Sequence, residues 1–230
     1  MKVVVTAGPT REHLDPVRFL SNPSTGKMGF AIAAEAARRG HDVTLIAGPV
    51  ALKTPKGVKR VDVVSAREML AVVIRAAKAG GDLRTPCGAP GGRALPQPAV
   101  FISTAAVADW RPAKCAAKKL KKGEMSPTLT LVRNPDILKT LNQKIKKSKN
   151  QTIRLVGFAA ETDHVLAEAA RKCREKGLSF IVANDVTQKG CGFGTDTNRV
   201  TFVFPDGTLK KFPLMTKRMV AKNIIREIEK

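Results

Sequence analysis

The chain has 230 residues, enough for one large domain with a buried core. Its 41 lysines and arginines against 19 acidic residues give a net charge of +22, typical of a strongly solvated surface or of polyanionic ligands. No apolar run is long enough to span a membrane and no secretory leader precedes the first strand, so we expect a cytoplasmic protein without membrane partners. The cysteines lack metal-ligand spacing, so we expect no structural zinc and four free thiols: Cys87, Cys115, Cys173 and Cys191.

Nucleic acid is one class of polyanion that would suit this charge. Aromatic residues make up only 4% of the chain and tyrosine is absent, which leaves few platforms on which bases stack. No recognised nucleic-acid-binding module is present either. A basic nucleic-acid-binding protein on a Rossmann-like scaffold is therefore kept as the alternative hypothesis, and we expect no specific nucleic-acid partner.

Apolar strands alternate with amphipathic helices along the chain. Strands are predicted at residues 3–6, 43–47, 58–64, 99–103, 128–132, 153–157 and 180–183, with a hairpin of 200–204 and 208–212. Helices are predicted at residues 26–39, 65–79, 135–142, 164–176 and 216–229, with a capping box at Ser65 and Glu68 and a cap at Thr216. This order predicts an α/β fold with a Rossmann-like, mostly parallel sheet, helices on both faces and a small antiparallel β element.

A single domain of residues 1–230 is expected, with two irregular stretches. Residues 80–98 hold five glycines and four prolines, which predicts a flexible surface insertion. Residues 113–125 are lysine-rich and are either a solvated loop or a flap that folds over phosphates.

The connection between the first strand and the first helix, residues 7–25, is long for an α/β unit, where about two to six residues are common. It contains small residues, hydroxyl groups and the arginines Arg11 and Arg18. It also leaves the carboxyl end of the first strand, where open α/β sheets bind ligands. We therefore predict that this connection contributes to an anion site.

Common cofactor motifs are absent. Ser21 and Met28 stand where a P-loop built on Gly26 and Lys27 needs glycine and a hydroxyl residue. The second strand ends in Ala47-Gly48 rather than in the acidic residue of a dinucleotide site, which argues against an oxidoreductase. The three histidines are scattered and are predicted to be structural: His13, His41 and His164.

Several strand ends carry groups suited to a nucleotide. Asp109 is placed to accept a hydrogen bond from a ribose, amide or base, or else to cap a turn. Residues 134–136 begin a short helix whose amides favour anions. Phe158 either stacks on a base or belongs to the core, and Lys172 and Lys176 share one helix face. Together these groups favour a nucleoside triphosphate over a redox cofactor.

Motifs along nearly the whole chain carry a family resemblance. They are Thr6-Ala-Gly-Pro-Thr-Arg-Glu12, Asp15-Pro-Val-Arg-Phe-Leu-Ser-Asn22, Ser24-Thr-Gly-Lys-Met-Gly29, Ala105-Ala-Val-Ala-Asp-Trp-Arg-Pro112, Lys119-Leu-Lys-Lys122, Asn134-Pro-Asp-Ile-Leu138, Val156-Gly-Phe-Ala-Ala-Glu-Thr162, Ala183-Asn-Asp-Val186 and Gly192-Phe-Gly-Thr-Asp-Thr-Asn198. In this order they resemble the phosphopantothenate–cysteine ligases (phosphopantothenoylcysteine synthetases) of coenzyme A biosynthesis, of the bacterial CTP-dependent type.

The resemblance implies a ligase that joins 4′-phosphopantothenate and L-cysteine. An acyl-cytidylate forms from CTP with Mg²⁺ and releases pyrophosphate, and the cysteine amine then displaces CMP. The family often carries a flavin-dependent decarboxylase half that this sequence lacks. We therefore expect a stand-alone ligase domain without flavin, a separate phosphopantothenoylcysteine decarboxylase as a partner, and a homodimer.

The resemblance also implies roles for individual residues, while the metal ligands stay unidentified. It implies catalytic roles for Lys119, a flap lysine needed for the second half-reaction, and for Asn22. It implies phosphopantothenate contacts for Arg18 from the partner subunit, Asn22, Ala105, Ala106 and Asp109. It implies CTP contacts for Asp109, Lys119, Pro135, Asp136, Ile137, Leu138, Phe158, Lys172 and Lys176. Residues 8–10 and 24–29 are expected to give backbone groups on the nucleotide side.

Overall fold

The computed structural model describes residues 1–77, 100–121, 123, 128–147, 153–161, 163–188 and 190–230. The predicted insertion at 80–98 and part of the predicted flap, residues 122 and 124–125, lie outside the described residues. Cys87 lies outside them as well, whereas the other three cysteines are free thiols, as expected. Among the described residues, none of the helices combines the length and apolar character needed to cross a membrane.

An eight-stranded sheet forms the centre of the molecule, in the order β13-β12-β10-β9-β6-β1-β4-β5. Six neighbouring strands are parallel: β1 (Lys2–Ala7), β4 (Asp42–Ala47), β5 (Val58–Asp62), β6 (Val100–Ser103), β9 (Arg154–Glu161) and β10 (Phe180–Asp185). Two antiparallel strands, β12 (Val200–Val203) and β13 (Leu209–Lys211), extend the sheet beyond β10. The mostly parallel α/β fold and the late hairpin are therefore confirmed.

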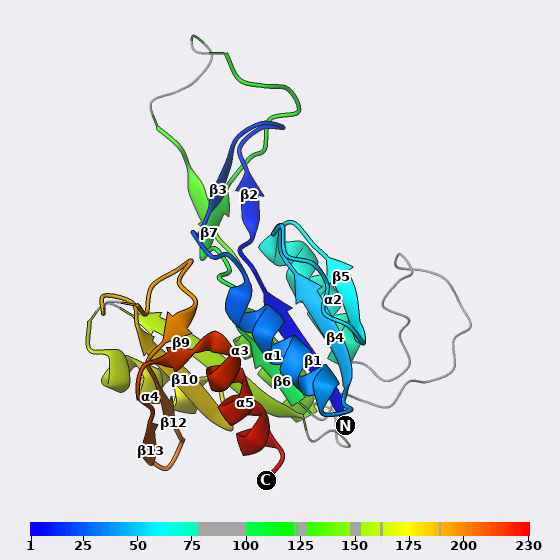
Figure 1. Cartoon of the computed structure of the whole chain (residues 1–230). Helices are drawn as coiled ribbons and strands as arrows, with labels where there is room; N and C mark the ends of the chain where they lie inside the picture. The colour runs from blue at the N-terminus through cyan, green and yellow to red at the C-terminus, as the bar shows by residue number, and fades with distance from the viewer. Residues whose placement is uncertain (78–99, 122, 124–127, 148–152, 162, 189) are drawn as a thin grey trace.

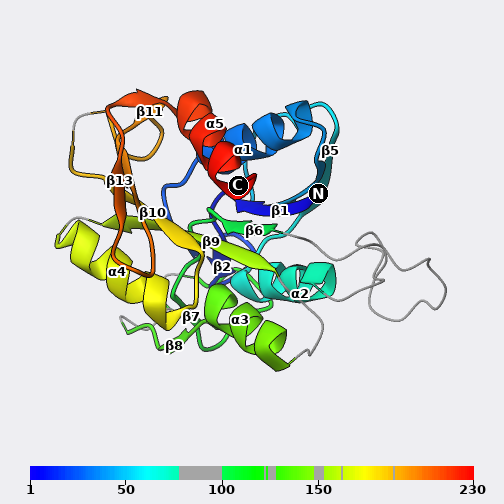
Figure 2. The ribbon, with the colours of Figure 1, turned by 90° about the horizontal axis from the view of Figure 1, so that it is seen from below.

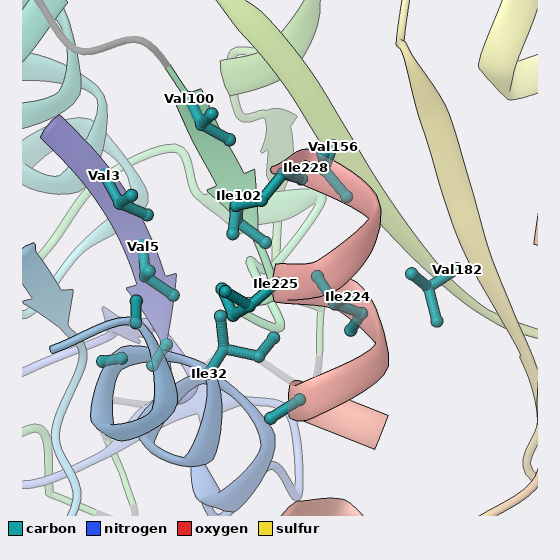
Figure 3. Packing of buried hydrophobic residues seen from close by; sticks show 14 of the residues in the cluster. Val3, Val5, Ile32, Val100, Ile102, Val156, Val182, Ile224, Ile225 and Ile228 are labelled. Carbon is teal, nitrogen blue, oxygen red and sulfur yellow. The ribbon is translucent and has the colours of Figure 1, made fainter. Parts of the chain in front are cut away.

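Helices cover both faces of the sheet, as predicted (Figure 2). One face is covered by α1 (Lys27–Arg38) and α5 (Lys217–Ile228), and the other by α2 (Ala66–Ala77), α3 (Ile137–Lys147) and α4 (Val165–Glu175). Successive residues of β1 point to opposite faces of the sheet. Val3 and Val5 pack with Ile32 and Ile225 beneath α1 and α5 (Figure 3), and Val4 packs on the opposite face. Burial on both faces explains why these strands are continuously apolar.

The predicted helix caps are present. The Glu68 amide donates to Ser65 Oγ at 3.2 Å, and the Met219 amide donates to Thr216 Oγ1 at 3.3 Å. Some boundaries were wrong: the helix predicted at 135–142 spans Ile137–Lys147, and the strand predicted at 128–132 is the shorter β8 (Leu131–Arg133).

Short strands inside the predicted loops were missed. The connection at 7–25 contains an antiparallel pair of β2 (Arg11–His13) and β3 (Phe19–Ser21), and β7 (Trp110–Pro112) pairs with β8. A third pair joins β11 (Thr197–Asn198) and β14 (Met215–Thr216). Segments of two or three residues are too short to show a period-two pattern, so hydrophobic periodicity does not reveal them.

Two of these pairs form a projection that we call the arm, made of residues 11–21 and the described part of 110–133. It extends from the end of the sheet at which the parallel strands finish (Figure 1). The Ala116 amide donates to the Leu14 carbonyl at 2.8 Å and the Ala113 amide to Thr130 at 2.9 Å, so the first half of the lysine-rich segment lies on the β2–β3 pair.

Candidate active site

A cleft opens where the direction of strand order reverses. From β1 the chain proceeds outward through β4 and β5, then returns to β6 on the other side of β1 and continues to β9 and β10. The first helices after these strands, α1 after β1 and α3 after β6, cover opposite faces of the sheet, and such a reversal is the usual ligand position in open α/β sheets. The cleft has a volume of about 530 Å³ and is lined by Asn22, by residues 24–29 and by the ends of β6, β9 and β10.

Glycines bring the start of α1 against the sheet at this point. A Cβ on Gly29 would lie 2.4 Å from Thr104 Oγ1 and 2.5 Å from Ala7 Cβ, so only glycine allows this approach. Gly26, the N-cap of α1, has a φ of 78° and no side-chain cap. The first amides of α1 are thus held at the cleft without a capping side chain.

The loop after β6 is fixed by amide side chains. Asn22 Nδ2 donates to the carbonyls of Ala106 at 3.1 Å and Val107 at 3.3 Å, and Asn134 Nδ2 donates to Ala108 at 2.8 Å. These contacts use the Asn22 nitrogen and leave its Oδ1 facing no donor among the described residues. Small side chains at Ala105 and Ala106 keep the backbone accessible from the cleft.

Two lysine–carboxylate pairs line the opposite wall. Lys172 Nζ lies 2.5 Å from Glu161 Oε1, and Lys176 Nζ lies 2.8 Å from Asp136 Oδ2. Burial of the Asp136 carboxyl raises its pKa, but hydrogen bonds from the Lys139 amide and from Lys176 outweigh this effect and lower the pKa. Both lysines are therefore oriented before any ligand arrives.

The remaining predicted contacts lie around the same cleft in different ways. Phe158 is half-buried and packs against the α1–α5 core while also lining the cleft, so its core role is confirmed and stacking on a base stays a prediction. Ile137 and Leu138 are buried, so the start of α3 offers backbone groups to the cleft. Asp109 has an exposed side chain, and its carbonyl accepts from the Asn134 amide at 2.7 Å.

The structure gathers every predicted site residue at this cleft except Arg18 and Lys119. Residues 24–29 line the cleft, whereas residues 8–10 do not, and none of the three histidines does.

Arg18 and Lys119 belong to the arm instead. Arg18 Nη2 lies 2.9 Å from Asp15 Oδ2 and also donates to the Leu120 carbonyl. The fully buried Asp15 carboxylate further accepts from the amides of Val17 and Arg18, both at 2.8 Å, and of Leu120 at 3.3 Å. Burial raises the pKa of Asp15, yet these amide bonds and the Arg18 charge lower it to about 2. Asp15 thus fastens the lysine-rich segment to the β2–β3 turn.

Two polar residues at the cleft, Asn184 and Lys217, were not predicted from the sequence, and Lys27 was expected to contribute only its backbone. Asn184 Nδ2 donates to the Cys191 carbonyl at 2.9 Å, while its buried Oδ1 has no partner within the described part of the chain. Lys27 and Lys217 also line the cleft. Asn184 at a strand end was a detectable signal, whereas Lys217 directly follows a helix cap and looked like an ordinary first-turn residue.

A protein-based metal site is not evident in the described part of the chain. There, no group of three or more His, Cys, Asp or Glu residues is placed to hold a metal ion. Of the carboxylates at the cleft, Asp136 and Glu161 are already paired with lysines.

Comparison with known proteins gives matches over nearly the whole chain. The family model described as the DNA/pantothenate metabolism flavoprotein C-terminal domain matches residues 1–83 and 92–230. The coenzyme A biosynthesis bifunctional protein CoaBC of Escherichia coli (strain K12) is 43% identical over 231 residues, covering 99% of this chain and 51% of the relative. The same-named protein of Bacillus subtilis (strain 168) is 44% identical over 227 residues, covering 98% and 50%. The chain thus spans about half the length of the curated relatives it matches.

Solved structures agree with the fold. The C-terminal domain of a CoaBC protein superposes with a TM-score of 0.76 at 39% identity, covering 99% of this chain and 93% of that one. A Cab2 mutant in complex with phosphopantothenate-cysteine superposes with a TM-score of 0.71 at 17% identity, covering 99% and 86%, and supports the fold alone.

Replacing Asp15 by asparagine is expected to destabilise the protein in a pH-dependent way. The folded-state pKa of about 2 lies below the ordinary 3.8, so the carboxylate stabilises the fold above pH 4 and loses this effect as the pH falls toward 2. Urea unfolding should therefore show a stability difference between wild type and Asp15→Asn that is full at pH 7 and shrinks below pH 4. Asp42→Asn, at an exposed carboxylate, is the matched control. A difference that does not vary with pH would contradict this role of the Asp15 charge.

Proposed function

Because the chain belongs to the family of the DNA/pantothenate metabolism flavoprotein C-terminal domain, we propose that it is a phosphopantothenate–cysteine ligase of coenzyme A biosynthesis. It joins 4′-phosphopantothenate and L-cysteine at the expense of CTP. The names of its relatives support the pathway, since they are coenzyme A biosynthesis proteins. A decarboxylase acting on phosphopantothenoylcysteine is the expected next enzyme.

The observation that carries the proposal is the composition of one cleft. Its α3–α4 wall presents Lys172 and Lys176 beside the start of α3, and its other side presents Asn22 and the loop after β6. The first set suits a nucleotide, because cations and helix amides favour phosphates. The second suits an uncharged amide chain, because backbone groups and the Asn22 Oδ1 offer hydrogen bonds without charge. Two such substrates placed side by side are what an acyl-nucleotide reaction requires.

The proposed chemistry has two displacements. A carboxylate oxygen of phosphopantothenate attacks the α-phosphorus of CTP, and the bond to the β-phosphate oxygen breaks to release pyrophosphate. The amine of cysteine then attacks the acyl carbon, loses a proton, and CMP leaves. Both leaving groups are anions, so fixed cations at the cleft lower both barriers. Mg²⁺ is expected to bind through the phosphates, the usual mode for a cation that retains several waters, and to neutralise their charge.

Pyrophosphate release is the direct test of this function. With Mg²⁺, purified protein should release pyrophosphate from CTP only when 4′-phosphopantothenate is present, and should release CMP when cysteine is added. The same assay with ATP, GTP and UTP measures nucleotide preference, for which we expect CTP to give the highest kcat/KM. Absence of phosphopantothenate-dependent pyrophosphate from all four nucleotides would refute the ligase proposal.

Lys119 is proposed to act in the second displacement. It is exposed on the arm in the described structure, so it reaches a reacting centre only when its segment closes over a cleft. There its charge would stabilise the leaving CMP, and its segment would keep water from the acyl-nucleotide.

Replacing Lys119 by glutamine should separate the two half-reactions. Removal of one preorganised hydrogen-bond donor to a developing anion costs about a hundredfold in rate. In single-turnover experiments with radiolabelled CTP, acyl-cytidylate should form at near the wild-type rate while amide formation slows by about that factor. Lys118→Gln, at the exposed neighbouring lysine, is the matched control. Equal slowing of both steps would contradict the assigned role.

A homodimer is proposed because the arm exposes apolar side chains and holds Arg18 away from its own cleft. Large hydrophobic residues on the arm are 38–57% exposed: Val17, Phe19, Trp110, Leu129 and Leu131. Such a concentration on a projecting element is typical of an interaction surface. A second copy of the chain would cover it and would receive Arg18 beside its cleft, where a substrate phosphate is expected.

Val17→Asp should shift the chain from dimer to monomer, because a carboxylate would be buried where an apolar side chain was. Val17 is 57% exposed in the single chain, so the monomer itself should fold normally. Sedimentation velocity should show the dimer dissociation constant rising by about tenfold or more. Leu166→Asp on α4, where the side chain is 37% exposed, controls for a surface charge. A wild-type monomer at micromolar concentration would exclude the dimer.

A further inference from the structure

A buried lysine side chain lies in the wall of the cleft formed by α1 and α5. Lys217 is the first residue of α5, is only 8% exposed, and lines the cleft. Its Nζ donates to the Thr195 carbonyl at 2.5 Å. An ammonium group has three donors. Within the described residues, this single carbonyl is its hydrogen-bond acceptor and no carboxylate lies within ion-pair distance.

The nearest charged side chains do not supply a counter-charge. Lys27 Nζ lies 2.7 Å from Asp196 Oδ1 and 2.9 Å from the Gly194 carbonyl, so the Asp196 charge is already paired. Asp196 is also 84% exposed, which screens it. Burial lowers the pKa of Lys217, and Lys27 lowers it further against a smaller opposite effect of Asp196. The amine is therefore a buried cation whose remaining donors have no partner among the described residues.

The same wall carries a second group of anion-binding donors. Lys27 and Lys217 hold the loop of residues 192–196 between the first turns of α1 and α5. The α1 turn begins at Gly26 without a capping side chain, so its first amides are oriented toward whatever occupies the cleft. A buried cation without an anion is unfavourable, and an anionic ligand would relieve that cost.

We propose that Lys217, with Lys27 and the first turn of α1, binds a phosphoryl group of a ligand in the cleft, opposite Lys172 and Lys176. This inference rests on the proposed function, which provides two phosphorylated ligands, a nucleoside triphosphate and 4′-phosphopantothenate. The chemistry recognised is the same in both: a terminal phosphoryl group that accepts hydrogen bonds from a buried ammonium and from helix amides.

A purely structural role would give a different result. If Lys217 only fastened the loop through Thr195, its removal would destabilise the unliganded protein and leave ligand affinity unchanged. If it awaits a phosphoryl group, removing the unpaired charge should leave the unliganded protein as stable as wild type or more stable, and ligand affinity should fall.

The experiment compares Lys217→Met and Lys217→Arg with Arg218→Met, which makes the same charge change at the exposed neighbour on α5. Calorimetry measures Kd for CTP–Mg²⁺, for inorganic tripolyphosphate and for 4′-phosphopantothenate separately, so that no reaction occurs. Lys217→Met should weaken binding of one phosphorylated ligand by about tenfold to a hundredfold, as expected for a hydrogen bond to a charged group. Lys217→Arg should restore part of the affinity, and Arg218→Met should bind like wild type.

The outcomes separate the ligands and the hypotheses. Weaker binding of CTP and tripolyphosphate assigns the site to the nucleotide, and weaker binding of 4′-phosphopantothenate alone assigns it to the acyl substrate. Wild-type Kd values for all three ligands in Lys217→Met overturn the inference, whatever the thermal stability.

Lys27→Met tests the same wall at a side chain that is 35% exposed, should Lys217→Met not fold. Unchanged affinities in that variant would likewise overturn the inference. Because these measurements need no turnover, they stand apart from the pyrophosphate assay: a protein that binds through Lys217 but releases no pyrophosphate keeps this site and loses the ligase proposal.

Discussion

The close contact between the first turn of α1 and the ends of β1 and β6 determines where the functional surface lies. Gly29 has no side chain where a Cβ would meet Thr104 and Ala7 at about 2.5 Å, and this allows the helix to start directly over the reversal of strand order. The loops after β1 and β6 are held together beside this helix start, since Asn22 Nδ2 donates to the Ala106 carbonyl. This packing places the first amides of α1 and the Asn22 side chain at the cleft.

Most of the lysines that line the cleft are paired with carboxylates. Lys172, Lys176 and Lys27 each face a carboxylate, which fixes their side chains at the cost of part of their field. In the proposed function, lysines fixed in this way would accept phosphates with little reorganisation. Lys217 differs, since its charge is buried and unbalanced among the described residues.

The sequence predicted those features that depend on periodicity and caps. Six parallel strands, both helical layers and the caps at Ser65 and Thr216 were identified because buried strands and amphipathic helices have strong patterns. The arm was not, because β2 and β3 are three residues long and are fixed by the Asp15 hydrogen bonds rather than by a buried face. Lys217 was missed because its burial depends on residues 192–196. These residues are distant from it in the sequence and pack against α5 only in the folded chain.

Two of the expected site residues, Arg18 and Lys119, lie on the arm, away from the cleft of the same chain. Asp15 binds both the turn that carries Arg18 and the amide of Leu120, next to Lys119, so these two cations move as one unit. These contacts lie within the arm, so the relative position of Arg18 and the Lys119 segment is kept wherever the arm lies. In the proposed dimer, the cleft that receives them belongs to the neighbouring subunit. If the proposed dimer and the proposed roles of Arg18 and Lys119 hold, the buried Asp15 carboxylate links the two, and a partner cleft that receives one receives the other as well.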